Sequence, residues 1–396
     1  MNANEVIQLD KEYIAPTYGR LELAPAYGKN ATLTDLNGKE YIDFTAGIGV
    51  NSIGIAPKAW VDAVTEQLGK IQHMSNYYYS EPTSKLAQKI IKASGAAKVI
   101  FQNSGAEANE VAIKAARKYS YDKYGTGRSK IITLVNSFHG RTVTTLSATG
   151  QDVFHKYFFP FTEGFAYVPA GDIDALTAEL DGTVCAIMCE AVQGEGGVNI
   201  LSKDYVAKIK EICDDNDILF VFDEVQTGVA RTGKVFAYQH HGIIPDIFTL
   251  AKGLGGGLPI GACVLSKKCE GVFGAGDHGT TFGGNPAVCA GANVVMDTVS
   301  EPDFLNAVNE KGEYIKAKIS SWELPIVKDV RGLGLMVGVS VTVSHKEAVK
   351  KCLENGLMML TAGKDVLRML PPLTITYEEI DKGLEILKKV LLSFSN

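Results

Sequence analysis

The chain is 396 residues long and carries 39 Lys and Arg against 45 Asp and Glu, a net charge of −6. This acidic balance argues against a general nucleic-acid binder. A composition of 46% hydrophobic and 21% charged residues excludes a disordered chain, and the length indicates about two to three structural units. Neither a membrane-spanning apolar run nor a signal-peptide core is present, so we expect a cytoplasmic protein that does not bind membranes.

Short apolar stretches alternate with helical patterns from about residue 84 to residue 290. A helix is predicted over residues 106–119. Strands are predicted over residues 98–102, 130–135, 185–189, 218–222, 247–250 and 260–265. Nearly continuous apolar strands that alternate with helices are typical of an α/β fold, in which a mostly parallel sheet is covered on both faces.

The last hundred residues change character and predict a smaller α+β domain. Short strands are expected over residues 331–339, 356–360 and 366–370, followed by an amphipathic helix that opens with a capping box of Thr376 and Glu379. The apolar face of that helix is formed by Tyr377, Ile380, Leu384, Leu387 and Leu391. We expect residues 1–45 to pack with this small domain (296–396), and residues 46–295 to form the large domain.

Cysteine and histidine usage bears on compartment and metals. The seven cysteines form no CxxC pair, which favours reduced thiols over disulfides or a zinc site. The seven histidines form no HExxH motif, and adjacent residues such as His240 and His241 point in different directions on a helix. We therefore expect no metal site.

Polar residues stand directly after several of the predicted strands. Asp223, Glu190 and Lys252 each follow an apolar strand, and Ser104 follows another strand and precedes a helix. In open α/β sheets, ligands bind beyond the carboxyl ends of the strands. One such carboxylate could simply be a hydrogen-bonded structural group, but several together indicate a site.

Three of these features suggest a particular cofactor. Small residues at Ser104, Gly105 and Ala106 leave backbone N–H groups free for a phosphate, although Ser before Gly is equally typical of a helix cap. Desolvation would lower the pKa of Lys252 and free its amine for Schiff-base chemistry, unless the side chain reaches solvent. Asp223 could pair with a pyridinium nitrogen. A phosphate seat, an amine and an acid together describe pyridoxal 5'-phosphate (PLP).

Three further side chains are candidates for contacts with cofactor and substrate. Phe138 could cover the ring of the cofactor, or could be a core aromatic after the strand at 130–135. Arg141 and Arg368 suit bidentate binding of carboxylates, although a single arginine is more often a surface residue.

Five strings occur in an order that resembles the class III PLP-dependent aminotransferases. They are NSGAEANE (103–110), EAVQGEGG (190–197), FDEVQTGVARTG (222–233), LAKGLGGGLPIGA (250–262) and GDHGTTFGGNP (276–286). The resemblance extends from Pro25 to Pro372. The string around Lys252 and the compact length favour the acetylornithine branch of the class over the ornithine and 4-aminobutyrate branches.

The resemblance implies the PLP-dependent transferase fold type I. In this fold, a large domain contains a mainly parallel seven-stranded sheet, and both ends of the chain form a small domain. Two such chains form a homodimer. It also implies cofactor contacts. Lys252 binds PLP covalently and then transfers protons, and Asp223 keeps the pyridinium protonated. The remaining contacts are Phe138 and Val225 on the ring faces, Gln226 at the phenolic oxygen, Ser104, Gly105 and Ala106 at the phosphate, and Thr281 from the partner subunit at the same phosphate.

The substrates implied are N2-acetyl-L-ornithine, 2-oxoglutarate and glutamate. Arg141 is expected to bind the α-carboxylate of acetylornithine, with Thr280 near the substrate, and Arg368 to bind the α-carboxylate of 2-oxoglutarate or glutamate. Glu195 resembles the glutamate that pairs with an active-site arginine in one half-reaction and releases it in the other.

The expected reaction transfers the δ-amino group of N2-acetyl-L-ornithine to 2-oxoglutarate, giving N-acetylglutamate 5-semialdehyde and glutamate in arginine biosynthesis. Ornithine, succinylornithine and 4-aminobutyrate are alternative amino donors. A nicotinamide-dependent dehydrogenase would need a GxGxxG motif after an early strand, which this sequence lacks. A non-catalytic binding module would bind no coloured cofactor.

Overall fold

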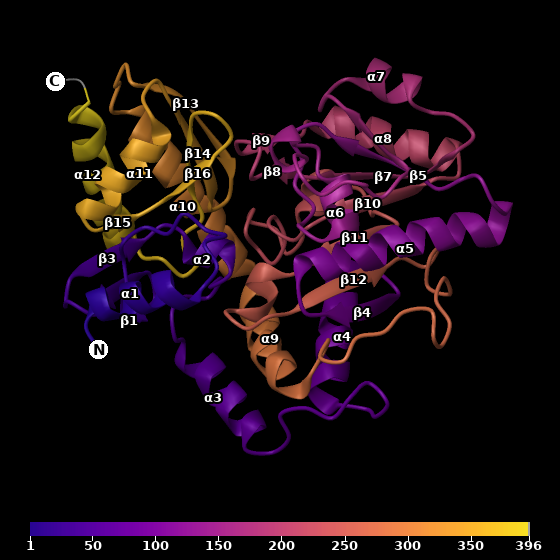
Figure 1. Cartoon of the computed structure of the whole chain (residues 1–396), viewed down its shortest axis with the longest axis horizontal. Helices are drawn as coiled ribbons and strands as arrows, with labels where there is room; N and C mark the ends of the chain where they lie inside the picture. Colours follow the sequence, from indigo (N-terminus) through magenta and orange to yellow (C-terminus); the bar gives the residue numbers. More distant parts are fainter. Residues whose placement is uncertain (395–396) are drawn as a thin grey trace.

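The computed structural model describes residues 1–394, and its centre is a seven-stranded sheet (Figure 1). The strand order is β4 (Lys98–Gln102), β12 (Gly261–Leu265), β11 (Ile247–Leu250), β10 (Leu219–Asp223), β7 (Val184–Glu190), β5 (Lys130–Leu134) and β6 (Phe165–Val168). Only β12 runs antiparallel to its neighbours within this sheet. The predicted α/β fold with a mainly parallel sheet is confirmed.

Helices cover both faces of this sheet because its strands are apolar on both sides. Ile187 and Phe220 pack with residues of α8 (Lys203–Asp215) in one hydrophobic cluster. Their neighbours Met188 and Val221 pack with residues of α5 (Gly105–Tyr124) in another. Alternate side chains of a strand point to opposite faces, so a strand between two helical layers is apolar throughout. Further helices of this part are α3 (Lys58–Leu68), α4 (Glu81–Ser94), α6 (Val143–Ala148), α7 (Ile173–Ala178) and α9 (Pro286–Val299).

The two ends of the chain lie side by side, with the indigo N-terminal segment against the yellow C-terminal segment in Figure 1. Strands β1 (Pro25–Lys29), β2 (Thr32–Asp35) and β3 (Glu40–Asp43) form a sheet with β15 (Leu357–Met358). Helix α1 (Ala3–Tyr13) precedes these strands. The parallel pairing of β3 with β15 supports the predicted packing of residues 1–45 with the small domain, whose limits stay a prediction.

The C-terminal part contains a second four-stranded sheet and three helices. The strands are β13 (Val327–Leu333), β14 (Met336–Val341), β17 (Val366–Met369) and β16 (Leu360–Ala362), and the helices are α10 (Pro302–Ser320), α11 (His345–Glu354) and α12 (Tyr377–Leu392). The single strand predicted over 331–339 is wrong, because the chain turns at Gly334 between β13 and β14. Gly334 has a φ of +53°, and a Cβ there would lie 2.5 Å from the carbonyl carbon of Thr232.

The closing helix α12 begins with the predicted capping box of Thr376 and Glu379. Ile380, Leu384, Leu387 and Leu391 are buried as predicted, whereas Tyr377 at the first helical position is 45% exposed. Among the helices of residues 1–394, none has both the length and the apolarity needed to cross a bilayer.

Candidate active site

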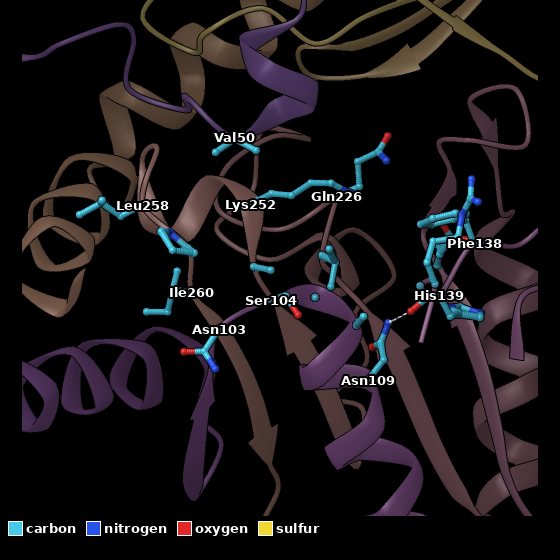
Figure 2. A pocket seen from close by; sticks show the side chains of 18 of the residues that line it. Val50, Asn103, Ser104, Asn109, Phe138, His139, Gln226, Lys252, Leu258 and Ile260 are labelled. Atoms are coloured by element: carbon cyan, nitrogen blue, oxygen red, sulfur yellow. Dashed lines mark hydrogen bonds between the residues drawn. The ribbon is translucent and has the colours of Figure 1, made fainter. Parts of the chain in front are cut away.

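A cavity of about 460 Å³ opens at the edge of the sheet where the parallel strands end (Figure 2). The sequence predicted that polar side chains meet here, and the structure places most of them around this cavity. The lining includes Ser104, Gly105, Ala106, Phe138, Arg141, Glu190, Val225, Gln226 and Lys252. These residues follow the carboxyl ends of five parallel strands, β4, β5, β7, β10 and β11, so the cavity lies at the edge of the sheet where these ends meet.

The start of α5 forms one wall of the cavity. Ser104 is the N-cap residue: its Oγ accepts a hydrogen bond from the Glu107 backbone N–H (3.2 Å) and donates one to Glu107 Oε2 (2.9 Å). The helix-cap interpretation of the Ser104 side chain is therefore confirmed. The backbone N–H groups of Gly105 and Ala106 have no intrahelical acceptor, since they belong to the first turn. These N–H groups give the start of α5 a partial positive charge beside the cavity, which Glu107 in the first turn partly offsets.

Gly105 also permits a close approach between two walls of the cavity. A Cβ built on Gly105 would lie 2.6 Å from Val225 Cγ1. Any larger residue would push Val225, in the segment after β10, away from the start of α5. The glycine therefore sets the width of the cavity at this point.

Lys252 follows β11 and opens the short 3₁₀ helix η3 (Lys252–Gly255). Its φ of +41° is rare for a residue with a side chain and costs backbone energy. Burial lowers the pKa of Lys252, although the nearby carboxylates of Glu195 and Asp223 oppose this shift. The lysine is thus held in a strained backbone position, with an amine that loses its proton more easily than an exposed lysine.

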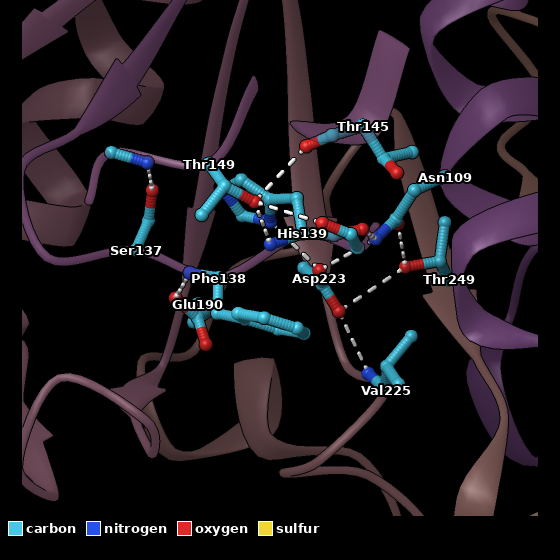
Figure 3. Close-up of polar contacts among 12 residues, drawn as sticks. Asn109, Ser137, Phe138, His139, Thr145, Thr149, Glu190, Asp223, Val225 and Thr249 are labelled. Carbon is cyan, nitrogen blue, oxygen red and sulfur yellow. Dashed lines mark hydrogen bonds and ion pairs between the residues drawn. The ribbon is translucent and has the colours of Figure 1, made fainter. Parts of the chain in front are cut away.

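Asp223 lies at the floor of the site, at the end of β10, and is held by three hydrogen bonds and a longer contact (Figure 3). Oδ2 accepts from Asn109 Nδ2 and contacts His139 Nδ1, both at 2.8 Å. Oδ1 accepts from the Val225 backbone N–H at 2.9 Å and lies 3.5 Å from Thr249 Oγ1, which donates its hydrogen to Asn109 Oδ1 (2.7 Å). These bonds fix the orientation of a buried carboxylate, which is what a charged group away from water requires.

Sequence reasoning missed the residues that hold Asp223. Asn109 lies on the buried side of α5 among alanines, and its side chain also donates to the His139 carbonyl (2.7 Å). A buried Asn on an otherwise apolar helix face was the available signal, because such a residue needs polar partners. For His139 and Thr249 the sequence contains no comparable signal.

Glu190 ends β7 next to Asp223 and lines the cavity. Its Oε2 accepts a hydrogen bond from the backbone N–H of Phe138 (3.1 Å). Burial raises the pKa of Glu190 well above its ordinary value, and the charge of Asp223 raises it further. The carboxyl therefore holds the Phe138 loop against the cavity.

Arg141 lies exposed at the mouth of the cavity and stacks on an aromatic side chain. Its Cζ lies 3.7 Å from the ring centroid of Phe154, and Phe154 contacts Phe138 edge-on, with 5.9 Å between centroids. This cation–π contact fixes the guanidinium without neutralising it. The charge of Arg141 stays available to an anion.

Glu195, Gln226 and Arg368 form a second polar cluster, which borders the cavity through Gln226. Arg368 Nη1 donates to Glu195 Oε1 (2.7 Å) and to Gln226 Oε1 (3.0 Å). The surface interpretation of Arg368 is wrong, since its side chain is 3% exposed. Burial alone would raise the pKa of Glu195, but the charge and hydrogen bond of Arg368 outweigh burial, and the pKa is lowered.

Thr280 and Thr281 lie outside the cavity of their own chain. Thr280 Oγ1 accepts hydrogen bonds from Asn103 Nδ2 (3.2 Å) and from the Gly283 backbone N–H (3.1 Å). Thr281 is exposed and borders a separate hollow of about 210 Å³. A contact of Thr281 with the cofactor, which the resemblance implies, would require a second subunit.

The comparisons with known proteins agree with this geometry. Residues 13–391 match the family described as aminotransferase class III, and the chain belongs to this family. An acetylornithine aminotransferase from Haemophilus ducreyi is 50% identical, and the match covers 99% of each chain.

Solved structures of the family have the same fold. An ornithine aminotransferase from Toxoplasma gondii superposes with a TM-score of 0.95 at 31% identity, covering 100% of this chain and 96% of that one. An acetylornithine aminotransferase from Elizabethkingia anophelis gives a TM-score of 0.88 at 31% identity, covering 99% of this chain and 100% of that one.

Class III aminotransferases use PLP, and the cavity fits this group. The first N–H groups of α5 suit the phosphate, the amine of Lys252 suits the aldehyde, and the buried Asp223 carboxylate suits the ring nitrogen. The missing Cβ of Gly105 lets Val225 pack directly against the start of α5, beside these N–H groups.

Proposed function

We propose that this protein transfers the δ-amino group of N2-acetyl-L-ornithine to 2-oxoglutarate, giving N-acetylglutamate 5-semialdehyde and glutamate in arginine biosynthesis. The main support is the set of full-length relatives: six proteins named acetylornithine aminotransferase are 40 to 50% identical to this chain over 96 to 99% of its length. The cavity contributes a cofactor site lined by Arg141, and the buried Arg368 lies beside it, bonded to Gln226; both arginines suit substrates that carry carboxylates.

The cofactor-binding residues act as follows. When bound, PLP withdraws electrons from the carbon that carries the transferred nitrogen. Lys252 would hold the aldehyde covalently until the substrate amine displaces it, and its freed amine would then move a proton between the two carbons on either side of the transferred nitrogen. Asp223 holds a proton on the ring nitrogen, and Gln226 binds the phenolic oxygen. Phe138 and Val225 hold the two ring faces, while Ser104, Gly105 and Ala106 hold the phosphate.

Two arginines bind the carboxylates of the two substrates. Arg141 binds the α-carboxylate of acetylornithine, which places the δ-amine at the reacting centre, and Thr280 lies near the bound substrate. Arg368 binds the α-carboxylate of 2-oxoglutarate or glutamate. The Nε of Arg368 is buried and has no acceptor among residues 1–394, which supports an unfilled carboxylate contact.

Glu195 alternates between two states in this scheme. It neutralises Arg368 while acetylornithine is bound and releases Arg368 when a dicarboxylate arrives. The observed 2.7 Å pair corresponds to the first of these states. The partial exposure of Glu195, 29% of its side chain, gives the carboxylate room to move.

The functional unit in this proposal is a homodimer in which Thr281 reaches the partner's phosphate site. Support comes from the hollow beside Thr281, which is bordered by aromatic side chains. Tyr78 and Tyr79, which border the hollow, are 68% and 100% exposed, and their sequence neighbours Tyr77 and Phe282 are 94% and 60% exposed. A group of exposed aromatic side chains is typical of a protein interface. We also infer a cytoplasmic location, which the seven buried, unpaired cysteines support.

Ornithine is the second candidate donor, because the chain superposes on the Toxoplasma gondii ornithine aminotransferase with a TM-score of 0.95. A panel of half-reactions separates the candidates. Acetylornithine, ornithine, succinylornithine and 4-aminobutyrate are each mixed with the cofactor-loaded protein, and the absorbance change of the cofactor is followed.

We expect the largest kcat/KM for acetylornithine. A preference for another donor would refute the substrate assignment and leave the class intact. Trapping with borohydride and peptide mapping should place the cofactor on Lys252, and Lys252→Ala should abolish the label. A label on another lysine would refute the site.

A further inference from the structure

Glu190 is a buried acid in the active site to which the proposed reaction gives no role. In the parallel ladder between β7 and β10, Glu190 is the direct partner of Asp223. Residues in register on neighbouring strands point to the same face, with backbones about 4.8 Å apart. Two ionised carboxylates at this spacing repel each other, and a shared site normally holds one proton.

The hydrogen bonds decide which of the two acids keeps the proton. Asp223 is contacted by four groups: Asn109, His139, Thr249 and the Val225 N–H. Glu190, only 5% exposed, accepts a single hydrogen bond, from the Phe138 N–H. Hydrogen bonds stabilise the charged form of a carboxylate, so Glu190, which accepts only one from the described residues, is the acid of this pair that holds the proton.

The other charged groups around Glu190 do not reverse this assignment. Lys252 of η3 favours the ionised form of Glu190, whereas Asp223 of β10 and Glu195 in the neighbouring loop disfavour it. Burial is the largest effect and also disfavours charge. His139, the nearest imidazole, is already held by Asp223 at 2.8 Å.

We propose that Glu190 carries a proton in the folded protein and is a positioning residue that keeps the amine of Lys252 reactive. Its Oε2 accepts from the Phe138 backbone N–H and fixes the loop over the cavity, which leaves Oε1 to carry the proton. A neutral Glu190 adds no negative charge beside Lys252, so the amine gives up its proton more readily. The second half of this proposal rests on the proposed role of Lys252.

Unfolding of the full chain tests the protonation state without any turnover. The stability of the wild type and of Glu190→Gln is measured between pH 4 and pH 9, with and without bound cofactor. Because the pKa of Glu190 is raised in the folded protein, its protonated form stabilises the fold at pH values below the ordinary pKa of 4.5. This stabilisation is lost as the pH rises from 4.5 to the folded pKa. Across that window, the folded-to-unfolded ratio of the wild type relative to Glu190→Gln should fall about tenfold per pH unit.

Glu195→Gln is the matched control, because the pKa of Glu195 is lowered and not raised. The folded-to-unfolded ratio of the wild type relative to Glu195→Gln should therefore rise as the pH rises from the folded pKa of Glu195 to its ordinary value. This slope is opposite to the one expected for Glu190→Gln. A flat ratio for Glu190→Gln, or the slope of the control, would overturn the proposal.

Two further measurements cover the remaining outcomes. The wild-type protein labelled with ¹³C-glutamate should show the infrared carbonyl band of a protonated carboxylic acid at pH 8, where Glu224, with a pKa of about 7, is mostly ionised. Absence of the band overturns the proposal even if Glu190→Gln fails to fold. Cofactor uptake at Lys252 is trapped by borohydride at a series of pH values, and the pH of half-maximal uptake should be the same in Glu190→Gln as in the wild type. A shift of this midpoint to lower pH in the variant would mean that Glu190 is ionised in the wild type, and would overturn the proposal.

Discussion

Replacing Glu195 by glutamine should change the two half-reactions in opposite directions. In the structure Glu195 Oε1 lies 2.7 Å from Arg368 Nη1, and this pair must open before a dicarboxylate can bind Arg368. Glutamine has the same shape but no charge. Arg368 is then easier to capture for 2-oxoglutarate, but is left uncompensated when acetylornithine occupies the cavity.

The size of the effect follows from the type of hydrogen bond that changes. A bond between charged groups contributes about 1.5–3 kcal/mol, and a bond to a neutral amide about 0.5–1.5 kcal/mol. The difference of about 1–1.5 kcal/mol corresponds to a factor of about 5 to 12. The half-reaction with 2-oxoglutarate should therefore gain about this factor in kcat/KM, and the half-reaction with acetylornithine should lose a similar factor.

Single-turnover absorbance measurements of both half-reactions give these ratios directly. Glu211→Gln is the control, since Glu211 lies exposed on α8 and its one ion pair within residues 1–394 is with Lys208. Equal changes in the two half-reactions would refute the alternating role of Glu195, and so would a loss confined to 2-oxoglutarate.

Three other substitutions test the cofactor cradle, the fold and the buried charge. Gly105→Ala places a Cβ 2.6 Å from Val225, so overpacking of about 1–3 kcal/mol should weaken cofactor binding about 5- to 150-fold, and an unchanged Kd in equilibrium dialysis would contradict this reasoning. Leu384→Ala removes a side chain that is 2% exposed on α12 and should cost about 2–5 kcal/mol in urea unfolding; a loss below about 1 kcal/mol would mean that the helix packs differently. Glu224 accepts from two backbone N–H groups and has a pKa raised by burial to about 7. Its stabilisation is lost as the pH rises from 4.5 to 7, so the advantage of the wild type over Glu224→Gln should shrink across this range, and a constant difference would refute the raised pKa.

Much of the fold was predictable because the strands of a covered parallel sheet are apolar throughout. Residues 98–102 and 247–250 were predicted as strands, and both have the bounds that the structure shows. The edge strand β4 was predicted, but the other edge strand, β6, was not. Strand β6 has only four residues, so its apolar run is too short to distinguish a strand from a loop. The turn at Gly334 was missed because a glycine inside a strand pattern also fits a bulge or a close contact.

The candidate site was predictable only where it follows from strand ends. Asp223, Glu190 and Lys252 were found because the carboxyl ends of adjacent parallel strands meet at one edge. The pair of Glu195 and Arg368 spans 173 positions in the sequence and depends on how β17 lies against the large domain. The spacing of residues along the chain does not show that Glu195 and Arg368 come into contact, so the pairing was predicted only from the resemblance to the family.

Register, more than the choice of residues, determines how the charges of this site are arranged. A shift of one residue between β7 and β10 would move Glu190 to the opposite face of the sheet from Asp223, since the side-chain period of a strand is two. Asp223 would then no longer have a second carboxyl group beside it, and the Phe138 backbone N–H would lose its acceptor. The apolar residues before both acids prevent this shift, because Ile187 and Met188 must face different helical layers. The packing of the sheet therefore fixes which carboxylates meet beside Lys252, and a core mutation that loosened this register should change the titration of the site before it unfolded the chain.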